Sequence, residues 1–96
     1  MEPEQSAASL LRQLRRSQGR SLRTVAQDVG LAPSQLSRIE RGQRGLGEGV
    51  PERLASYYGV SADLIALAEG RLPPDALRIL QAHPEALDQL RRRYDD

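Results

Sequence analysis

The sequence predicts an all-α protein built as one small domain. Apolar residues recur at helical spacing along the chain, and no stretch alternates strictly or is rich in β-branched residues, as a strand would be. Gly and Pro divide the chain into segments of helical length. With 96 residues, 39% of them hydrophobic and 28% charged, the chain can build one core but not two. We therefore expect a single helical domain with, at most, a short extension.

Local signals place each helix in turn. Ser21 and Ser61 are suitable N-caps, Gly30 is suited to the left-handed position after a last turn, and Pro33 fits the first position of a helix. A Gly-rich loop over residues 42–49 separates the third helix from the fourth. The predicted helices cover residues 6–17, 22–29, 33–41, 50–58, 62–69, 75–82 and 85–94, and the last two follow a seam at residues 71–74.

Positive charge is concentrated in one third of the chain. Residues 10–45 hold eight Arg against Asp28 and Glu40, a sum of +6, whereas residues 46–70 sum to −3 and the whole chain to +1. All 14 basic residues are Arg, whose planar guanidinium suits phosphates and guanine edges. A solvated surface would explain such a cluster as well, so the charge needs support from another feature.

That support comes from the second and third predicted helices. They are joined by the three-residue turn Gly30-Leu31-Ala32, and the small Ala26 stands where they would cross, which predicts a helix-turn-helix. Helical spacing puts small, polar and cationic residues on the outward face of the third helix, a composition that suits the DNA major groove. On this face lie Ser34, Ser37, Arg38 and Arg41, with Gln35 at its border, while Leu36, Ile39 and Glu40 lie on the opposite side.

The segment from Ser21 to Gly42 resembles the helix-turn-helix of the Cro/phage-repressor (xenobiotic-response-element type) family of transcriptional regulators. Its most specific part is Leu36-Ser-Arg-Ile-Glu-Arg-Gly42, and the resemblance extends over residues 10–70. The resemblance implies a lambda-repressor-like five-helix domain over residues 1–70. The Pro pair at residues 73–74 separates it from a short C-terminal helical extension over residues 71–96. The resemblance also implies a transcriptional regulator, in our interpretation a repressor that binds an inverted-repeat DNA operator as a homodimer.

The resemblance also implies roles for individual residues. The positions that match base contacts are Ser34, Gln35 and Arg38, and we expect phosphate contacts from Ser21, Arg23, Ser37, Arg41 and Arg44. Arg15 and Glu40 match a structural ion pair between the first and third helices. Leu22 departs from the family pattern, because many members have a phosphate-contacting Gln there, so we expect Leu22 to join the core instead.

The C-terminal section carries more apolar surface than a closed five-helix domain can easily cover. The residues concerned are Leu77, Leu80, Leu87, Leu90 and Tyr94. Either the last two helices fold back on the first or fifth helix of the same chain, or they form a self-complementary patch at a two-fold axis. We favour the second arrangement, which makes these residues a dimerisation surface.

Several functions remain as alternatives, and others are not expected. An antitoxin or a restriction-modification controller would use the same domain, and a protein-interaction module could carry an inactive helix-turn-helix. Without Cys and with a single His, the chain offers no usual zinc ligand set, so we expect no metal, cofactor or catalytic residue. The apolar stretch at residues 64–68 is too short to span a membrane, and residues 1–5 do not resemble a signal peptide, so we expect a cytoplasmic protein without membrane contact.

Overall fold

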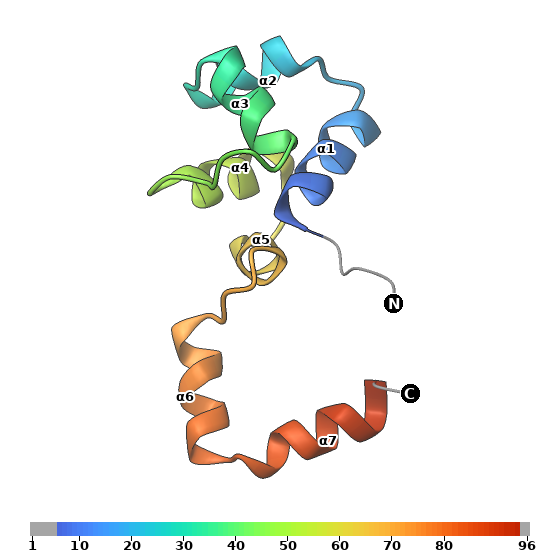
Figure 1. Ribbon diagram of the computed structural model, residues 1–96, viewed down its shortest axis with the longest axis vertical. Coiled ribbons are helices and arrows are strands. Elements are labelled where there is room, and N and C mark those ends of the chain that lie inside the picture. The colour runs from blue at the N-terminus through green and yellow to red at the C-terminus, as the bar shows by residue number, and fades with distance from the viewer. Residues whose placement is uncertain (1–5, 95–96) are drawn as a thin grey trace.

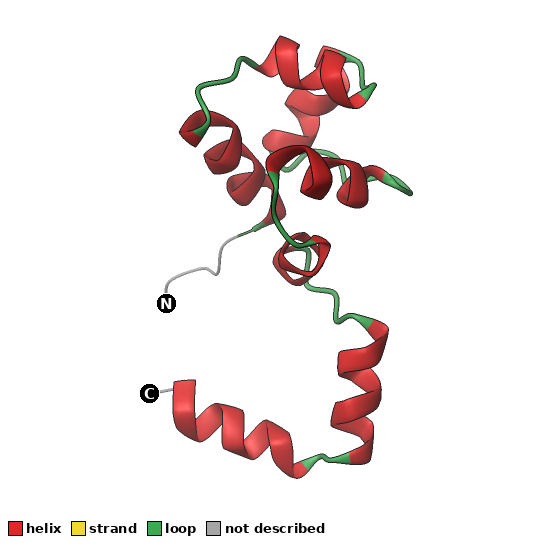
Figure 2. Cartoon of the chain, turned by 180° about the vertical axis from the view of Figure 1, so that it is seen from behind, coloured by secondary structure: helices red, strands yellow, loops and turns green. Residues whose placement is uncertain are grey.

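The computed structural model describes residues 6–94, and all regular structure in that range is helical (Figures 1 and 2). Residues 1–5 and 95–96 lie outside the described part, so the expected segments 1–70 and 71–96 are seen only from residue 6 and up to residue 94. The prediction of an all-α protein is confirmed. The helices are α1 (Ala7–Ser17), α2 (Leu22–Val29), α3 (Pro33–Glu40), α4 (Val50–Tyr58), α5 (Ala62–Ala68), α6 (Pro74–Ala82) and α7 (Glu85–Tyr94).

The ends of α2 and α3 follow from local capping. The Ser21 backbone is extended, and its Oγ accepts the N–H of Thr24 at 3.1 Å, which satisfies one of the free donors at the start of α2. Gly30 ends α2 with a φ of 77°, a left-handed conformation that would be strained in a residue with a Cβ. The prediction of a third helix up to residue 41 was one residue too long: α3 ends at Glu40, and Arg41 is its C-cap with φ −95° and ψ 1°.

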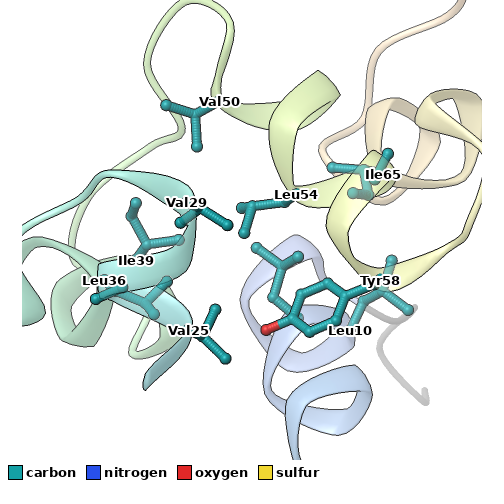
Figure 3. Packing of buried hydrophobic residues seen from close by; sticks show 12 residues of the cluster. Leu10, Val25, Val29, Leu36, Ile39, Val50, Leu54, Tyr58 and Ile65 are labelled. Atoms are coloured by element: carbon teal, nitrogen blue, oxygen red, sulfur yellow. The ribbon is translucent and has the colours of Figure 1, made fainter. Parts of the chain in front are cut away.

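The first five helices enclose one hydrophobic core. Figure 3 shows side chains from α1 to α5 pointing into the same space. The core side chains are Leu10, Leu11, Val25, Ala26, Val29, Leu36, Ile39, Val50, Leu54, Ala55, Tyr58 and Ile65. Leu22 packs against them and is partly buried, as expected for a residue that replaces a phosphate contact. This core lies between residues 10 and 65, so these five helices form a unit with its own interior.

Helices α6 and α7, which together we call the arm (residues 74–94), project from the five-helix unit (Figures 1 and 2). They pack against each other, and no residue of either helix is buried. Pro74 is already the first residue of α6, one position before the predicted start, because proline fits the first turn of a helix. The arm therefore does not extend the core of the five-helix unit.

Tyr58 is a core residue with an unusual feature. Its side chain is buried, and its hydroxyl oxygen has no hydrogen-bond partner among the described residues. The rings of Tyr57 and Tyr58 meet edge to face with centroids 5.2 Å apart. Burial, followed by the negative charge of Glu40, raises the pKa of Tyr58 to about 12. The phenol therefore stays neutral at physiological pH.

Replacing Tyr58 with Phe is expected to raise the free energy of unfolding by about 1 kcal/mol, because the ring is kept while an unpaired buried hydroxyl is removed. In the wild type, stability should also decline as pH rises from about 10, where the unfolded phenol ionises, because the unfolded chain then holds fewer protons than the folded one. Urea denaturation at pH 7 and at pH values up to about 11 checks both effects. A Tyr58→Phe variant with lower stability, or with the same decline as the wild type, would contradict this account.

Candidate nucleic-acid interface

Helices α2 and α3 cross closely over a short turn. Ala26 and Leu36 are fully buried, and the small side chain of Ala26 lets the two helices approach. The N–H of Leu31, in the turn, donates to the Ala26 carbonyl at 2.8 Å and so satisfies an acceptor at the end of α2. The orientation of α3 on α2 is thus set by core packing and by a closed turn, which is the helix-turn-helix arrangement expected from the sequence.

The two sides of α3 differ sharply in exposure. Leu36, Ile39 and Glu40 are buried, whereas Ser34 and Arg38 are exposed. Gln35 and Ser37 are half-buried, and Arg41, just after the helix, is exposed. Every residue expected to contact a base therefore retains surface that a ligand could touch. The outer face carries hydroxyl, amide and guanidinium groups, and among the described residues no large apolar side chain lies exposed on it.

An ion pair fixes α3 to α1 on the inner side. Arg15 Nε lies 2.9 Å from one carboxylate oxygen of Glu40 and 3.1 Å from the other, and Nη2 donates to the carboxylate at 2.9 Å. The side chains are only 14% and 4% exposed, so water screens the pair little. The hydrogen bond to Glu40 raises the pKa of Arg15 above its usual value. Glu40 is thus fully engaged in the scaffold and is not directed toward a nucleic acid.

Arg12 holds the same end of α3 through the backbone. Its Nη1 donates to the Glu40 carbonyl at 2.7 Å, where the last turn of the helix leaves acceptors unpaired. In the sequence, Arg12 is only one of the eight Arg of the basic cluster at residues 10–45. The spacing of Arg12 and Arg15 on consecutive turns of α1 was the available signal, since residues three apart lie on one face of a helix.

A second set of contacts supports α2 from α4, and the sequence did not reveal it. Arg53 Nη1 donates to the Val29 carbonyl at 2.8 Å and so caps the C-terminal end of α2. Tyr57 Oη donates to an Asp28 carboxylate oxygen at 2.7 Å, and this hydrogen bond raises the pKa of Tyr57. The guanidinium of Arg20 lies 4.6 Å from the centre of the Tyr57 ring, within the range of a cation–π contact.

These contacts divide the basic cluster into two groups. Arg12, Arg15 and Arg20 make contacts within the fold, as described above. The remaining Arg residues of the cluster are all exposed: Arg16, Arg23, Arg38, Arg41 and Arg44. Arg41 also turns back on its helix, where its Nε donates to the Ser37 carbonyl at 3.3 Å. The charge available to an outside anion is therefore smaller than the composition indicates.

Ser21, one of the expected phosphate contacts, already uses its hydroxyl. Its Oγ accepts from the Thr24 N–H and donates to Thr24 Oγ1 at 2.9 Å. Arg23, in the first turn of α2, and Arg44, in the loop after α3, are both exposed. At the start of α2, the Ser21 hydroxyl is therefore occupied by the helix cap, and the exposed Arg23, two residues later, offers positive charge to a phosphate.

Comparison with known proteins supports the architecture of this surface. A family model described as a helix-turn-helix domain matches residues 7–68, which spans α1 to α5 and stops before the arm. Searches of curated proteins and of solved structures gave no match. Within residues 6–94, no helix is long and apolar enough to cross a membrane.

Proposed function

Because the chain belongs to the helix-turn-helix domain family, we propose that it is a sequence-specific regulator of transcription that binds double-stranded DNA through α3. The observation that carries this proposal is the outer face of α3, on which Ser34 and Arg38 are exposed while Leu36 and Ile39 are buried in the core. A rigid helix with such a face can enter the major groove without disturbing the core. We further propose that the protein acts as a repressor at an inverted-repeat operator.

The side chains of α3 have distinct roles in this proposal. Arg38 has the donor geometry to bond guanine O6 and N7 together, and Gln35 can pair with adenine N6 and N7. Ser34, being short, permits close approach of the helix start to a base edge. We propose phosphate contacts from Ser21, Arg23, Ser37, Arg41 and Arg44, which hold the helix in register without reading sequence. For its contact, Ser21 exchanges the hydrogen bond from its hydroxyl to Thr24 Oγ1 for one to the phosphate.

Selection of bound sequences from random duplex DNA tests this proposal directly. The expected result is one enriched motif with inverted-repeat symmetry, because a dimer with a two-fold axis presents two copies of α3 to successive major grooves. An enriched motif without symmetry would contradict the homodimer on DNA. A pool with no enrichment, from protein shown to be folded by circular dichroism, would contradict sequence-specific binding altogether.

Binding to this DNA is expected to weaken steeply as salt increases. Each phosphate neutralised by an Arg releases condensed counterions, and the slope of log K against log salt is roughly −0.9 per phosphate contact. With five exposed Arg in the basic cluster, these residues of a monomer contribute a slope no steeper than about −4.5. Fluorescence anisotropy titrations from about 50 to about 300 mM salt check this expectation, and an affinity that hardly changed would contradict it.

We propose that the homodimer forms through the arm, which would make residues 1–70 the DNA-binding domain and residues 71–96 the dimerisation segment. The apolar side chains proposed for this contact are Leu77, Leu80, Leu87, Leu90 and Tyr94, and all but Leu80 are at least 40% exposed. Leu80, Leu90 and Tyr94 line a shallow groove of about 460 Å³ between α6 and α7. Exposed apolar surface of this extent usually marks a contact with another molecule.

Truncation after Gly70 is expected to give a folded monomer that binds operator half-sites weakly and without cooperativity. The reason is that the core lies between residues 10 and 65, while no residue of α6 or α7 is buried. Light scattering and operator titration check the mass and the cooperativity. A truncated protein that stayed dimeric and bound the full operator normally would contradict the role of the arm, and one that unfolded would show that the arm supports the core.

A further inference from the structure

The exposed apolar side chains are unevenly distributed over the molecule. Among the described residues, every large hydrophobic side chain that is exposed lies between residues 64 and 94, and none lies in the helix-turn-helix. Among the described residues, the proposed DNA-binding face thus carries no exposed large hydrophobic side chain, and those that are exposed all lie in the C-terminal third of the chain. These side chains lie on α5, on the arm and, in the case of Leu72, on the connection between them.

The outer face of α5 is an apolar patch with an acidic residue beside it. Leu64 is 44% exposed and Leu67 is 54% exposed, and neither belongs to the core cluster. Ile65, between them, is fully buried and anchors α5 to the core. The exposed Asp63 lies next to Leu67 on the same face, since residues four apart are neighbours on a helix.

The apolar side of α7 is bordered by basic residues. Leu87, Leu90 and Tyr94 follow the spacing i, i+3 and i+7, so they lie along one side of the helix. Helical spacing places Arg91 and Arg93 at the two borders of this stripe, and the Arg93 guanidinium lies 5.5 Å from the centre of the Tyr94 ring. The stripe on α7 is therefore apolar like the α5 patch, and the charged residues beside the two surfaces are opposite in sign.

Within one chain these two surfaces do not meet. The Arg71 N–H donates to the Ala66 carbonyl at 2.9 Å, and the Arg71 guanidinium is paired with Glu69, so the chain after α5 leaves in a defined direction. Pro73 and Pro74 then stiffen the connection to α6. Both views show α7 separated from α5, with α6 between them along the chain (Figures 1 and 2).

We propose that the stripe on α7 of one copy lies on the outer face of α5 of a second copy, and the reverse, so that two chains exchange arms. This inference rests on the homodimer proposed above and specifies which surface receives the arm. Asp63 of one copy then lies beside Arg93 of the other, at the edge of the contact between Leu64, Leu67 and the apolar stripe.

A second copy fits this surface because each chain carries both halves of the contact. The halves are opposite in charge: Asp63 is the one charged residue of the receiving helix α5 (Ala62–Ala68), which sums to −1, while α7 (Glu85–Tyr94) sums to +1 and has its three Arg at residues 91–93. A reciprocal exchange covers the α5 patch and the α7 stripe of both chains at once. Because no such surface is then left open, the assembly ends at a dimer. Short helices such as α6 and α7, which are marginal alone in water, would gain support from the same contact.

Charge reversal in the full-length protein tests the exchange. Sedimentation equilibrium without DNA at low salt is expected to show a wild-type dimer, and Asp63→Arg or Arg93→Glu alone should each weaken it about tenfold by placing like charges together. An equimolar mixture of the two variants should form a heterodimer that is tighter than either variant alone, because one of its two contacts keeps the wild-type pair and the other joins the reversed pair. Arg92→Glu is the matched control: it makes the same charge change on the side of α7 away from the stripe and should leave the dimer unchanged.

Each other outcome overturns the exchange. If the single variants dimerise like the wild type, or if their mixture is no tighter than its components, Asp63 and Arg93 do not meet between copies. If Arg92→Glu weakens the dimer as much as Arg93→Glu, net charge and not position is responsible. A monomeric wild type would refute both the exchange and the homodimer, whereas the selection from random DNA tests sequence-specific binding separately. Thermal melting of each variant checks that the variant is folded. Formation of the heterodimer in the mixture is a second check, because only folded chains can form it.

Discussion

Replacing Glu40 with Ala is expected to lower the free energy of unfolding by about 3–5 kcal/mol, the usual cost of leaving one partner of a buried ion pair alone. The Glu40 side chain is only 4% exposed and accepts three hydrogen bonds from Arg15. Without it, the Arg15 guanidinium would remain in the fold with little water to replace the carboxylate. Since a small domain has a total stability of only about 5–15 kcal/mol, this loss is a large share of the free energy of unfolding.

Urea denaturation followed by circular dichroism measures this loss. Glu48→Ala is the matched control, because Glu48 is exposed in the Gly-rich loop and its replacement should change stability by less than about 0.5 kcal/mol. Glu40→Gln keeps the shape but not the charge, so we expect a loss smaller than that of Glu40→Ala. A Glu40→Ala variant as stable as Glu48→Ala would mean that the pair does not hold α1 to α3.

Arg38→Ala is expected to remove the preference for one base of the operator and to weaken binding to the selected sequence by roughly 5- to 150-fold, which corresponds to the usual 1–3 kcal/mol of a bidentate base contact. Arg38 is exposed on the outer face of α3, so folding should be unaffected. The measurement is a titration against the selected operator and against its single-base variants.

Arg41→Ala serves as the comparison on the same surface. Arg41 is exposed at the end of α3 and in our proposal touches a phosphate, so its loss should weaken binding to all sequences alike and lower the salt dependence by about 1. If Arg38→Ala left the selected motif unchanged, or if Arg41→Ala altered it, the assignment of the base-reading residue would be wrong. Equal melting temperatures of both variants and the wild type exclude a folding effect.

Local chemistry explains how much of the fold could be predicted. Helix ends depend on residues within a few positions of each other, so Ser21, Gly30 and Pro33 were sufficient to place α2 and the start of α3. The two sides of α3 were also predictable, because helical spacing alone separates the buried Leu36 from the exposed Arg38. The pairing of Arg15 with Glu40 could not be predicted from local signals, because the two residues are 25 positions apart. Only the resemblance to a family predicted it.

Contacts between distant segments depended on the tertiary structure. Arg12 reaches a carbonyl 28 positions away, and Arg53 reaches one 24 positions away, because the packing of the core brings helix ends beside α1 and α4. In sequence these residues are ordinary surface cations, and the composition therefore overstates the charge that is free to meet DNA.

The arm shows most clearly which features local sequence signals predict and which depend on the tertiary structure. Helical periodicity and the Pro pair determined that residues after 70 form two more amphipathic helices, because those signals act over one or two turns. Whether these helices fold back or project depends on the geometry of a connection that no periodic pattern encodes. The tertiary structure decided it: the hydrogen bond from Arg71 to Ala66 and the stiff Pro73 direct α6 away from α5, and both apolar surfaces remain uncovered within one chain.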